Sequence, residues 1–345
     1  MQRVKSLDLA RGFTVLMMAP VHTILLYSKP YVYDTLPGKL LAFIAEGPGA
    51  QLFMLIMGIC FTFSKHTIQS VLQRAFILLL AAYALNIFKF ILPSFLYPMP
   101  IELLKELQVN NDFEGRMQMF LLGDILHFAA LTLLILFFVS RLQHYYHYAL
   151  YVAIFICFTS PFFWDAYCTN PAINYILQLT GGQPPRVYFP LLPWLVYPLV
   201  GLSIGYFFQT ETKEIFLKLG IIGCLLVAGG YVLQHYFLND PASSFYRTYP
   251  ADTIQHIGIV LITLDLWELV ERYVKPNYFF KLLSYSSLHI TQIYCIQWIL
   301  IFWLLPLFGY QQLDLIPSLF CIILTTIITY FLSFCLNVYG KRKPV

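Results

Sequence analysis

Apolar runs of about 20 residues alternate with short polar or proline-bearing segments along the chain. A helix needs about 20 mostly apolar residues to cross a bilayer core of about 30 Å. The pattern therefore predicts an all-α, polytopic membrane protein with ten spanning helices, folded as a single domain over residues 1–345. The predicted spans are 8–27, 46–64, 72–92, 119–139, 146–163, 187–208, 214–237, 254–273, 284–307 and 315–337.

Composition agrees with this prediction and excludes an ordinary soluble enzyme. Of the 345 residues, 59% are hydrophobic and 11% charged, whereas soluble domains carry about 45–50% apolar and about 25% charged residues. The net charge of +4 is small and no stripe of Arg and Lys alternates with aromatic residues, so we expect no nucleic-acid partner. The seven cysteines form no CxxC pair, and we expect no metal.

Basic residues predict the orientation of the bundle. Ten spans place both termini on the same side of the membrane. If that side is the cytoplasm, fourteen Lys and Arg residues face it, while seven, including Lys89, face outside. Basic residues are enriched in cytoplasmic loops, so we predict cytoplasmic termini. The outer connections 94–118 and 164–186 have the size of a lid rather than of a domain. Because a large luminal domain is therefore not expected, we expect a bacterial inner membrane rather than a lysosome.

The first span carries an arginine and a histidine on one helix face. Arg11 and His22 are eleven residues apart, which is about 16 Å along a helix and about 20° more than three turns. Titratable groups inside a span are costly and usually face the bundle interior or a wet cavity. Asp8, one turn before Arg11, could hold its guanidinium or cap the start of the helix. An anchoring role for Arg11 and a structural role for His22 stay open as alternatives.

The fourth span begins with a second pair of titratable groups. Asp124 and His127 are three residues apart and are therefore neighbours on one helix face. We expect them at the depth of His22, in the outer third of the membrane. A carboxylate that orients an imidazole typically supports a general base. A polar clasp between helices is the structural alternative.

Other polar positions favour structural roles. Asp265 and Glu268 in the eighth span are expected to pair with Arg11 or Arg74, in preference to a proton relay. The ninth span is expected to form helix–helix hydrogen bonds. Its polar residues are His289, Thr291, Gln292 and Gln297. The proline-rich segment 184–194 predicts either the lining of an outer cavity or an aromatic anchor at the membrane surface.

The first span resembles the R-x10-H pattern of acyltransferase-3-like transmembrane acyltransferases. In this chain the pattern consists of Arg11 and His22, separated by ten residues, and the flanking segment SLDLARGF. Further segments resemble one branch, the heparan-alpha-glucosaminide N-acetyltransferase catalytic-domain family. These segments are GAQLFMLIMGICFTFS (49–64), LQRAFILLL (72–80), GDILHFAALTLLI (123–135) and YFPLLPWLVYPLVGLSIG (188–205). The resemblance covers most of residues 3–300. It departs from relatives at Val71, where a second arginine is common, and at Thr291 and Tyr294 in SLHITQIY.

The resemblance implies transfer of an acyl group, usually acetyl, from cytoplasmic acetyl-CoA to a sugar across the membrane. Arg11 and Arg74 are then expected to hold the phosphates of acetyl-CoA. His22 is expected to deprotonate the hydroxyl or amine of the acceptor. Asp124 or His127 is expected to orient His22 or to stabilise its charged form. The bilayer and a carbohydrate such as a glucosamine-type sugar are the implied partners.

Several alternatives stay open on the sequence alone. Direct transfer and a relay through acetyl-His22 are both consistent with it, as are O- and N-transfer, and a monomer and a homodimer. A transporter or flippase for a small acid or sugar-lipid would use Arg11 and His22 along a proton or substrate pathway. A non-catalytic relative that binds lipid or glycan would not need His22 for activity.

Overall fold

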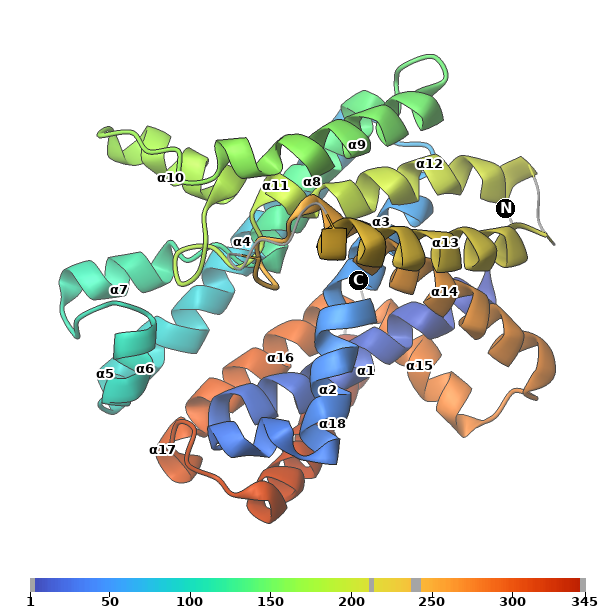
Figure 1. Ribbon diagram of the computed structural model, residues 1–345. Coiled ribbons are helices and arrows are strands. Elements are labelled where there is room, and N and C mark those ends of the chain that lie inside the picture. Colours follow the sequence, from blue (N-terminus) through green and yellow to red (C-terminus); the bar gives the residue numbers. More distant parts are fainter. Residues whose placement is uncertain (1–3, 211–213, 237–242, 342–345) are drawn as a thin grey trace. The chain divides into compact units, whose positions relative to one another are not determined.

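The computed structural model describes residues 4–210, 214–236 and 243–341. Within these residues every regular element is a helix (Figure 1), accompanied by two isolated bridges. The described residues form two compact units. The first unit takes its residues from 1–7, 47–83 and 121–273, and the second takes them from 8–46, 84–120 and 274–345.

Eight helical stretches among the described residues are long and apolar enough to cross a membrane. They are Lys5–Tyr27, Leu36–Phe61, Ile68–Leu96, Tyr145–Phe163, Leu191–Gln209, Ile215–Tyr236, Pro250–Tyr273 and Leu315–Val338. Two shorter apolar helices, Ile125–Val139 and Ile290–Trp303, lie within the other two predicted spans. The expectation of an all-α, polytopic membrane protein is therefore confirmed.

The fourth and ninth predicted spans were too long. The span 119–139 is interrupted, because α7 (Phe113–Phe120) ends before α8 (Ile125–Val139) begins at its cap Asp124. The span 284–307 is divided at His289, whose φ of −116° and ψ of 30° are not helical, into α15 (Tyr278–Leu288) and α16 (Ile290–Trp303). Apolar composition continues through both breaks, so hydropathy alone does not reveal them.

The first unit consists of helices that approach at glycines. Its helices are α3 (Ala50–Phe61), most of α4 (Ile68–Asn86), α8, α9 (Tyr145–Phe163), α10 (Pro171–Gly181), α11 (Leu191–Trp194), α12 (Val196–Thr210), α13 (Ile215–Tyr236) and α14 (Pro250–Tyr273). A Cβ on Gly58 of α3 would lie 2.0 Å from the carbonyl oxygen of Pro198, and one on Gly201 of α12 would lie 2.0 Å from that of Leu55. This close backbone contact is typical of membrane helix pairs with small interface residues. Figure 1 also shows α13 and α14 side by side.

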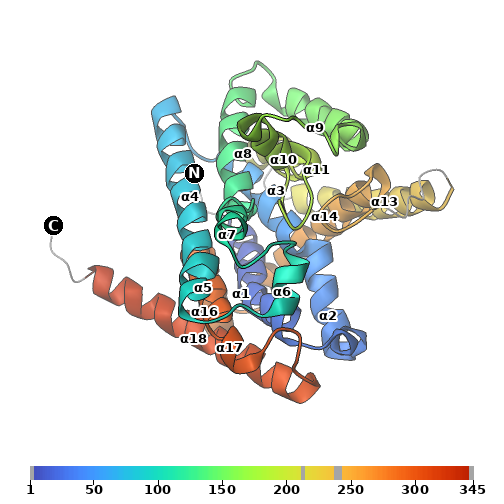
Figure 2. The same cartoon turned by 90° about the vertical axis from the view of Figure 1, so that its left-hand side faces the viewer.

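The second unit contains most of the first helix of the chain. Its helical elements are most of α1 (Lys5–Tyr27), a 3₁₀ turn (Pro30–Asp34), α2 (Leu36–Ile44), a π-helical turn (Ile87–Ile91), α5 (Leu92–Leu96), α6 (Ile101–Glu106), α7, α15, α16, α17 (Leu305–Phe308) and α18 (Leu315–Lys341). The short helices α5, α6 and α7 gather in one region (Figure 2). A Cβ on Gly12 of α1 would lie 2.0 Å from the carbonyl oxygen of Leu283 on α15, so these two helices also touch at the backbone.

The last helix shows how the bundle meets lipid. One face of α18 is apolar and exposed: Ile316, Phe320, Ile323, Ile327, Phe331 and Phe334 are 59–80% exposed and recur every three or four residues. The opposite face carries the fully buried Ser318, Thr325, Thr329 and Ser333. An apolar stripe of this kind on a long membrane helix indicates contact with the bilayer.

Basic residues counted for the orientation are only partly described. Arg3, Lys213, Arg342 and Lys343 lie outside the described residues. Lys89 was expected outside the membrane, but it is 3% exposed and lies in the π-helical turn within the span Ile68–Leu96. The cytoplasmic location of the termini stays a prediction.

Candidate functional site

His22 lies on α1 and is held from two sides by consecutive residues of α16. The side-chain amide of Gln297 lies 3.1 Å from Nδ1 of His22. The ring of Trp298 stacks on the imidazole, with centroids 4.1 Å apart and planes 25° apart. Tyr294, one turn earlier on α16, presents an edge-to-face ring 6.4 Å away. The edge and one face of the imidazole are therefore fixed by α16.

Arg11 belongs to a compact polar cluster on the same helix. Its Nη2 pairs with Oδ1 of Asp8 at 3.0 Å, and its Nε donates to Oγ of Ser287 at 3.0 Å. Ser287 in turn donates to Oδ1 of Asp8, also at 3.0 Å. The side chain of Arg11 is 20% exposed. The predicted pairing of Asp8 with Arg11 is confirmed, and the serine completes a closed triangle.

Arg11 and His22 thus face the same neighbouring segment, as their spacing predicts. Ser287 is near the end of α15 and Gln297 is on α16, so the α15–α16 segment contacts both residues. α1 is one helix from Lys5 to Tyr27, with Pro20 inside it. The Cα atoms of Arg11 and His22 are therefore about 16 Å apart along the helix axis, from the helical rise.

A lysine lies beside the same tryptophan. Nζ of Lys89 is 4.7 Å from the ring centroid of Trp298, and 4.5 Å and 5.6 Å from those of Phe90 and Phe302. π-helical turns inside α-helices are frequent at functional sites, and buried cations within membranes are usually functional. The second unit therefore places an imidazole and an ammonium group against a single indole.

Asp124 and His127 form a capping box at the start of α8. Oδ1 of Asp124 accepts from the backbone N–H of Ile125 at 2.7 Å, and Nδ1 of His127 accepts from the backbone N–H of Asp124 at 3.1 Å. The ring of Tyr83 meets that of His127 edge-on at 4.7 Å. Both side chains thus satisfy backbone groups at a helix end, a local role that the three-residue spacing also permits.

The proline-rich segment packs against this helix start. The backbone N–H of Gly123 donates to the carbonyl of Arg186, and the N–H of Tyr188 donates to the carbonyl of Gly123, both at 2.9 Å. Trp194 is 2% exposed and its Nε1 donates to the carbonyl of Tyr246. Trp194 is therefore a core residue, and the expectation of a surface anchor is wrong for it.

The sequence-predicted site residues are divided between the two units. Arg11 and His22 lie in the second unit, whereas Arg74, Asp124 and His127 lie in the first. Arg74 is exposed on α4. The approach of Asp124 or His127 to His22, and the sharing of phosphates by Arg11 and Arg74, stay predictions.

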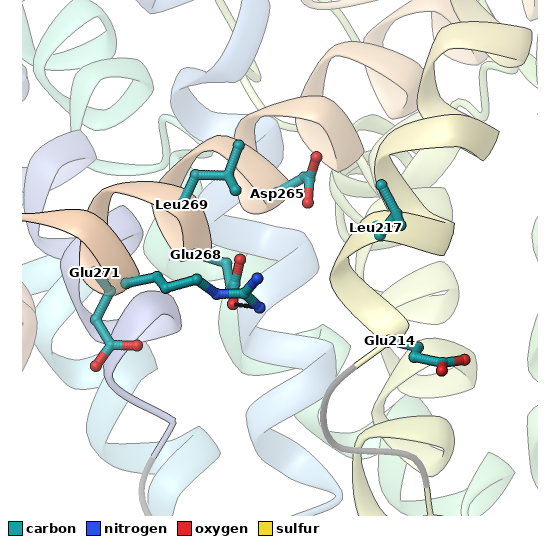
Figure 3. Close-up of a pocket in the computed structure, with 7 residues that line it drawn as sticks. Glu214, Leu217, Asp265, Glu268, Leu269 and Glu271 are labelled. Atoms are coloured by element: carbon teal, nitrogen blue, oxygen red, sulfur yellow. Dashed lines mark hydrogen bonds and ion pairs between the residues drawn. The ribbon is translucent and has the colours of Figure 1, made fainter.

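A hollow of about 730 Å³ opens beside α13 and α14 (Figure 3). Four carboxylates line it, those of Glu214, Asp265, Glu268 and Glu271, with one guanidinium, Arg272. Glu268 pairs with Arg272 rather than with Arg11 or Arg74. An excess of negative charge repels phosphates, so this hollow does not suit acetyl-CoA. No cluster of three metal-ligating side chains occurs among the described residues.

The expected helix–helix hydrogen bonds of the ninth span are confirmed at two positions. Gln292 donates to the carbonyl of Ser333, and His289 lies 3.4 Å from the amide of Asn337, both on α18. Gln297 also bonds between helices, but its partner is the candidate base His22. Sequence reasoning missed Gln297, Ser287 and Lys89 as site residues. A lysine within an apolar span was the one available signal.

Comparison with known proteins places most of the chain in one family. The family model described as heparan-alpha-glucosaminide N-acetyltransferase, catalytic, matches residues 3–241. No curated protein and no solved structure matches the chain. The matched range includes Arg11, His22, Arg74, Asp124 and His127, and ends before α15 and α16.

Proposed function

The chain belongs to the heparan-alpha-glucosaminide N-acetyltransferase catalytic family of membrane acetyltransferases, and from this premise we propose its reaction. The proposed donor is acetyl-CoA on the cytoplasmic side. The proposed acceptor is a hydroxyl or amino group of an extracytoplasmic carbohydrate, such as a glucosamine-type sugar. The proposed location is a bacterial inner membrane.

The observation that carries this proposal is the geometry around His22. An imidazole with a fixed edge and a fixed face is oriented as a general base must be. In the proposed step the acceptor oxygen or nitrogen attacks the thioester carbon while His22 takes its proton. The C–S bond then breaks, and CoA leaves as a thiolate that recovers the proton from the imidazolium. The products are the acetylated acceptor and CoA.

A relay through the histidine gives the same products. In that version His22 attacks the thioester carbon, the C–S bond breaks and CoA leaves as a thiolate. The acceptor then attacks the carbonyl carbon of acetyl-His22, the C–N bond to the imidazole breaks, and the proton lost by the acceptor neutralises the thiolate. Asp124 and His127 are proposed to orient His22 or to stabilise its charged form in either version.

Arg11 is proposed to hold phosphates of the donor. Its guanidinium is oriented by Asp8 and Ser287, and guanidinium groups match phosphate geometry well. Arg74, exposed on its helix, is proposed as a second phosphate ligand. An acetyl group bound through these residues would have to be delivered along α1 towards His22.

The test uses purified wild type and His22→Ala with labelled acetyl-CoA and a panel of carbohydrate acceptors that includes glucosamine. His235→Ala is a matched control, because His235 is exposed near the end of α13. We expect wild type and His235→Ala to release CoA and label a sugar, and His22→Ala to lose both activities. Equal activity of His22→Ala and wild type would refute the assigned base. A folded wild type that neither binds acetyl-CoA nor releases CoA would favour the transporter.

A further inference from the structure

Gln297 contacts the candidate base at Nδ1, and the hydrogen bond at this nitrogen determines which tautomer the neutral imidazole adopts. The residue is fully buried, and its Nε2 lies 3.1 Å from Nδ1 of His22. Its other amide atom, Oε1, is buried and has no hydrogen-bond partner within the described residues. The two residues are 275 positions apart in sequence. A buried amide that bonds an imidazole at one end and is unsatisfied at the other end destabilises the fold. Packing alone therefore does not explain its presence.

The amide can face the imidazole in two ways with the same heavy-atom positions. The oxygen and nitrogen of a glutamine exchange places by a half-turn of the amide. If NH₂ faces Nδ1, the amide donates, the neutral ring carries its proton on Nε2, and Nε2 has no lone pair. If the carbonyl faces Nδ1, the ring donates from Nδ1 and Nε2 carries the lone pair.

The proposed reaction distinguishes these orientations. A base must offer a lone pair, and once it has taken the proton both ring nitrogens are donors. With NH₂ facing Nδ1, that charged state would place two donors against each other. With the carbonyl facing Nδ1, the same contact satisfies both the neutral and the charged ring. Burial favours neither orientation of the amide, because each orientation leaves one of its two polar atoms unsatisfied.

We propose that Gln297 is a positioning residue that presents its carbonyl to Nδ1 of His22 and so makes Nε2 the reactive nitrogen. The inference rests on the proposed function, because a purely structural histidine would not require a particular tautomer. Stacking by Trp298 complements the effect by keeping the ring plane fixed. Fixing the tautomer through the second ring nitrogen is a general way to orient a catalytic imidazole.

The direct test reads the tautomer without any substrate. The protein with ¹⁵N-labelled histidine is measured by NMR in lipid, at a pH well above the ordinary pKa of histidine. The His22 signal is identified by its loss in His22→Ala. We expect a proton on Nδ1 in wild type and its transfer to Nε2 in Gln297→Leu. Wild type with the proton on Nε2, or an unchanged tautomer in Gln297→Leu, would overturn the inference.

Gln292→Leu is the matched control for this test. Gln292 lies on the same helix, and its amide donates to the carbonyl of Ser333 instead of to the histidine. The same substitution there removes a half-buried amide from α16 but should leave the His22 tautomer unchanged. A tautomer change in Gln292→Leu as large as in Gln297→Leu would show a general disturbance of α16 and overturn the specific role.

Kinetics provide the second measurement, with acetyl-CoA and glucosamine as the probes. Gln297→Leu should lower kcat about 10- to 100-fold, a part of the usual contribution of a general base, with the KM for acetyl-CoA changed less than twofold. Gln297→Glu should retain activity and move the acid limb of its pH profile upward, because a carboxylate accepts from Nδ1 and favours the charged ring. An inactive but folded Gln297→Glu would contradict the role.

The two levels of the argument fail separately. If His22→Ala is fully active, the base assignment fails and the positioning role of Gln297 fails with it, whatever the tautomer. If folded wild type neither binds acetyl-CoA nor transfers acetyl, the proposed function fails. If His22→Ala is inactive and Gln297→Leu has the kcat and tautomer of wild type, the proposed function stands and the positioning role fails. Should Gln297→Leu not fold, Gln297→Glu and the wild-type tautomer still decide the question.

Discussion

Replacing Ser287 with alanine should weaken the binding of acetyl-CoA while sparing the chemical step. The hydroxyl of Ser287 accepts from Nε of Arg11 and donates to Oδ1 of Asp8, each at 3.0 Å. The side chains of Arg11 and Asp8 are only 20% and 12% exposed. Ser287→Ala therefore leaves one guanidinium N–H and one carboxylate lone pair with little water to replace the hydroxyl.

The expected effect can be worked from these contacts. A hydrogen bond to a charged group contributes about 1.5–3 kcal/mol. The ion pair of Arg11 with Asp8 persists in the variant, so we take the lower bound of one bond, about 1.5 kcal/mol. If this free energy is lost from donor binding, the KM for acetyl-CoA rises roughly tenfold. The kcat should stay within about twofold, since His22 is held by other residues.

The adjacent serine supplies the control. Ser286 is fully buried, and its hydroxyl bonds to the carbonyl of Leu282 and to the hydroxyl of Tyr330. CoA release is measured against acetyl-CoA concentration for both alanine variants in proteoliposomes, with thermal unfolding followed in parallel. An equal rise of KM in Ser286→Ala, or a fall of kcat alone in Ser287→Ala, would refute the assignment of Arg11 to the donor phosphates.

Three further predictions concern a glycine at a helix contact, the hydrogen bonds of Arg247 and the cap of α8. Gly201→Ala should destabilise the fold by about 1–3 kcal/mol or more, because the added Cβ would lie 2.0 Å from the carbonyl oxygen of Leu55. In the control variant Gly229→Ala the added Cβ has no atom within 4 Å, so thermal unfolding should show no loss of stability. Arg247→Met should lower the free energy of unfolding by roughly 3 kcal/mol, because the buried guanidinium donates to two backbone carbonyls and two side chains. Proteolysis of the 164–186 connection should become faster, and an unchanged rate would contradict the prediction. Asp124→Asn should retain stability, since Asn is as good a helix cap, and should lose acetyl transfer if the charge supports His22; full activity would refute that role.

Hydropathy and helical spacing were sufficient for most of the fold. Eight of the ten predicted spans correspond to long helices, because a bilayer core imposes length and apolar composition together. The breaks at Asp124 and His289 were missed, since each depends on backbone geometry at one position within an apolar run. Counting Lys89 with the outer charges followed from its position near the end of a span, whereas the structure surrounds its ammonium with aromatic rings.

Only the part of the candidate site that lies within a single helix was predictable from the sequence. The spacing within α1 placed Arg11 and His22 on one face, because a helix fixes direction over eleven residues. Their partners Ser287 and Gln297 are about 275 residues away in sequence, and neither serine nor glutamine within an apolar run indicates which helix it will meet. That information lies in tertiary packing.

The packing that hid these partners also fixes the placement of Arg11 and His22 along α1. Hydrogen bonds along α1 follow the α15–α16 segment in the same direction: Arg11 donates to Ser287, His22 contacts Gln297, and the hydroxyl of Tyr27 donates to the carbonyl of Ile301. Because α1 is continuous and contacts the same segment near both ends, the Cα atoms of Arg11 and His22 are held about 16 Å apart along its axis. Turning either side chain away would break a part-buried hydrogen bond. If Arg11 holds the donor as proposed, the acyl group has to travel a distance that one continuous helix fixes, and such preorganisation would favour the proposed transfer.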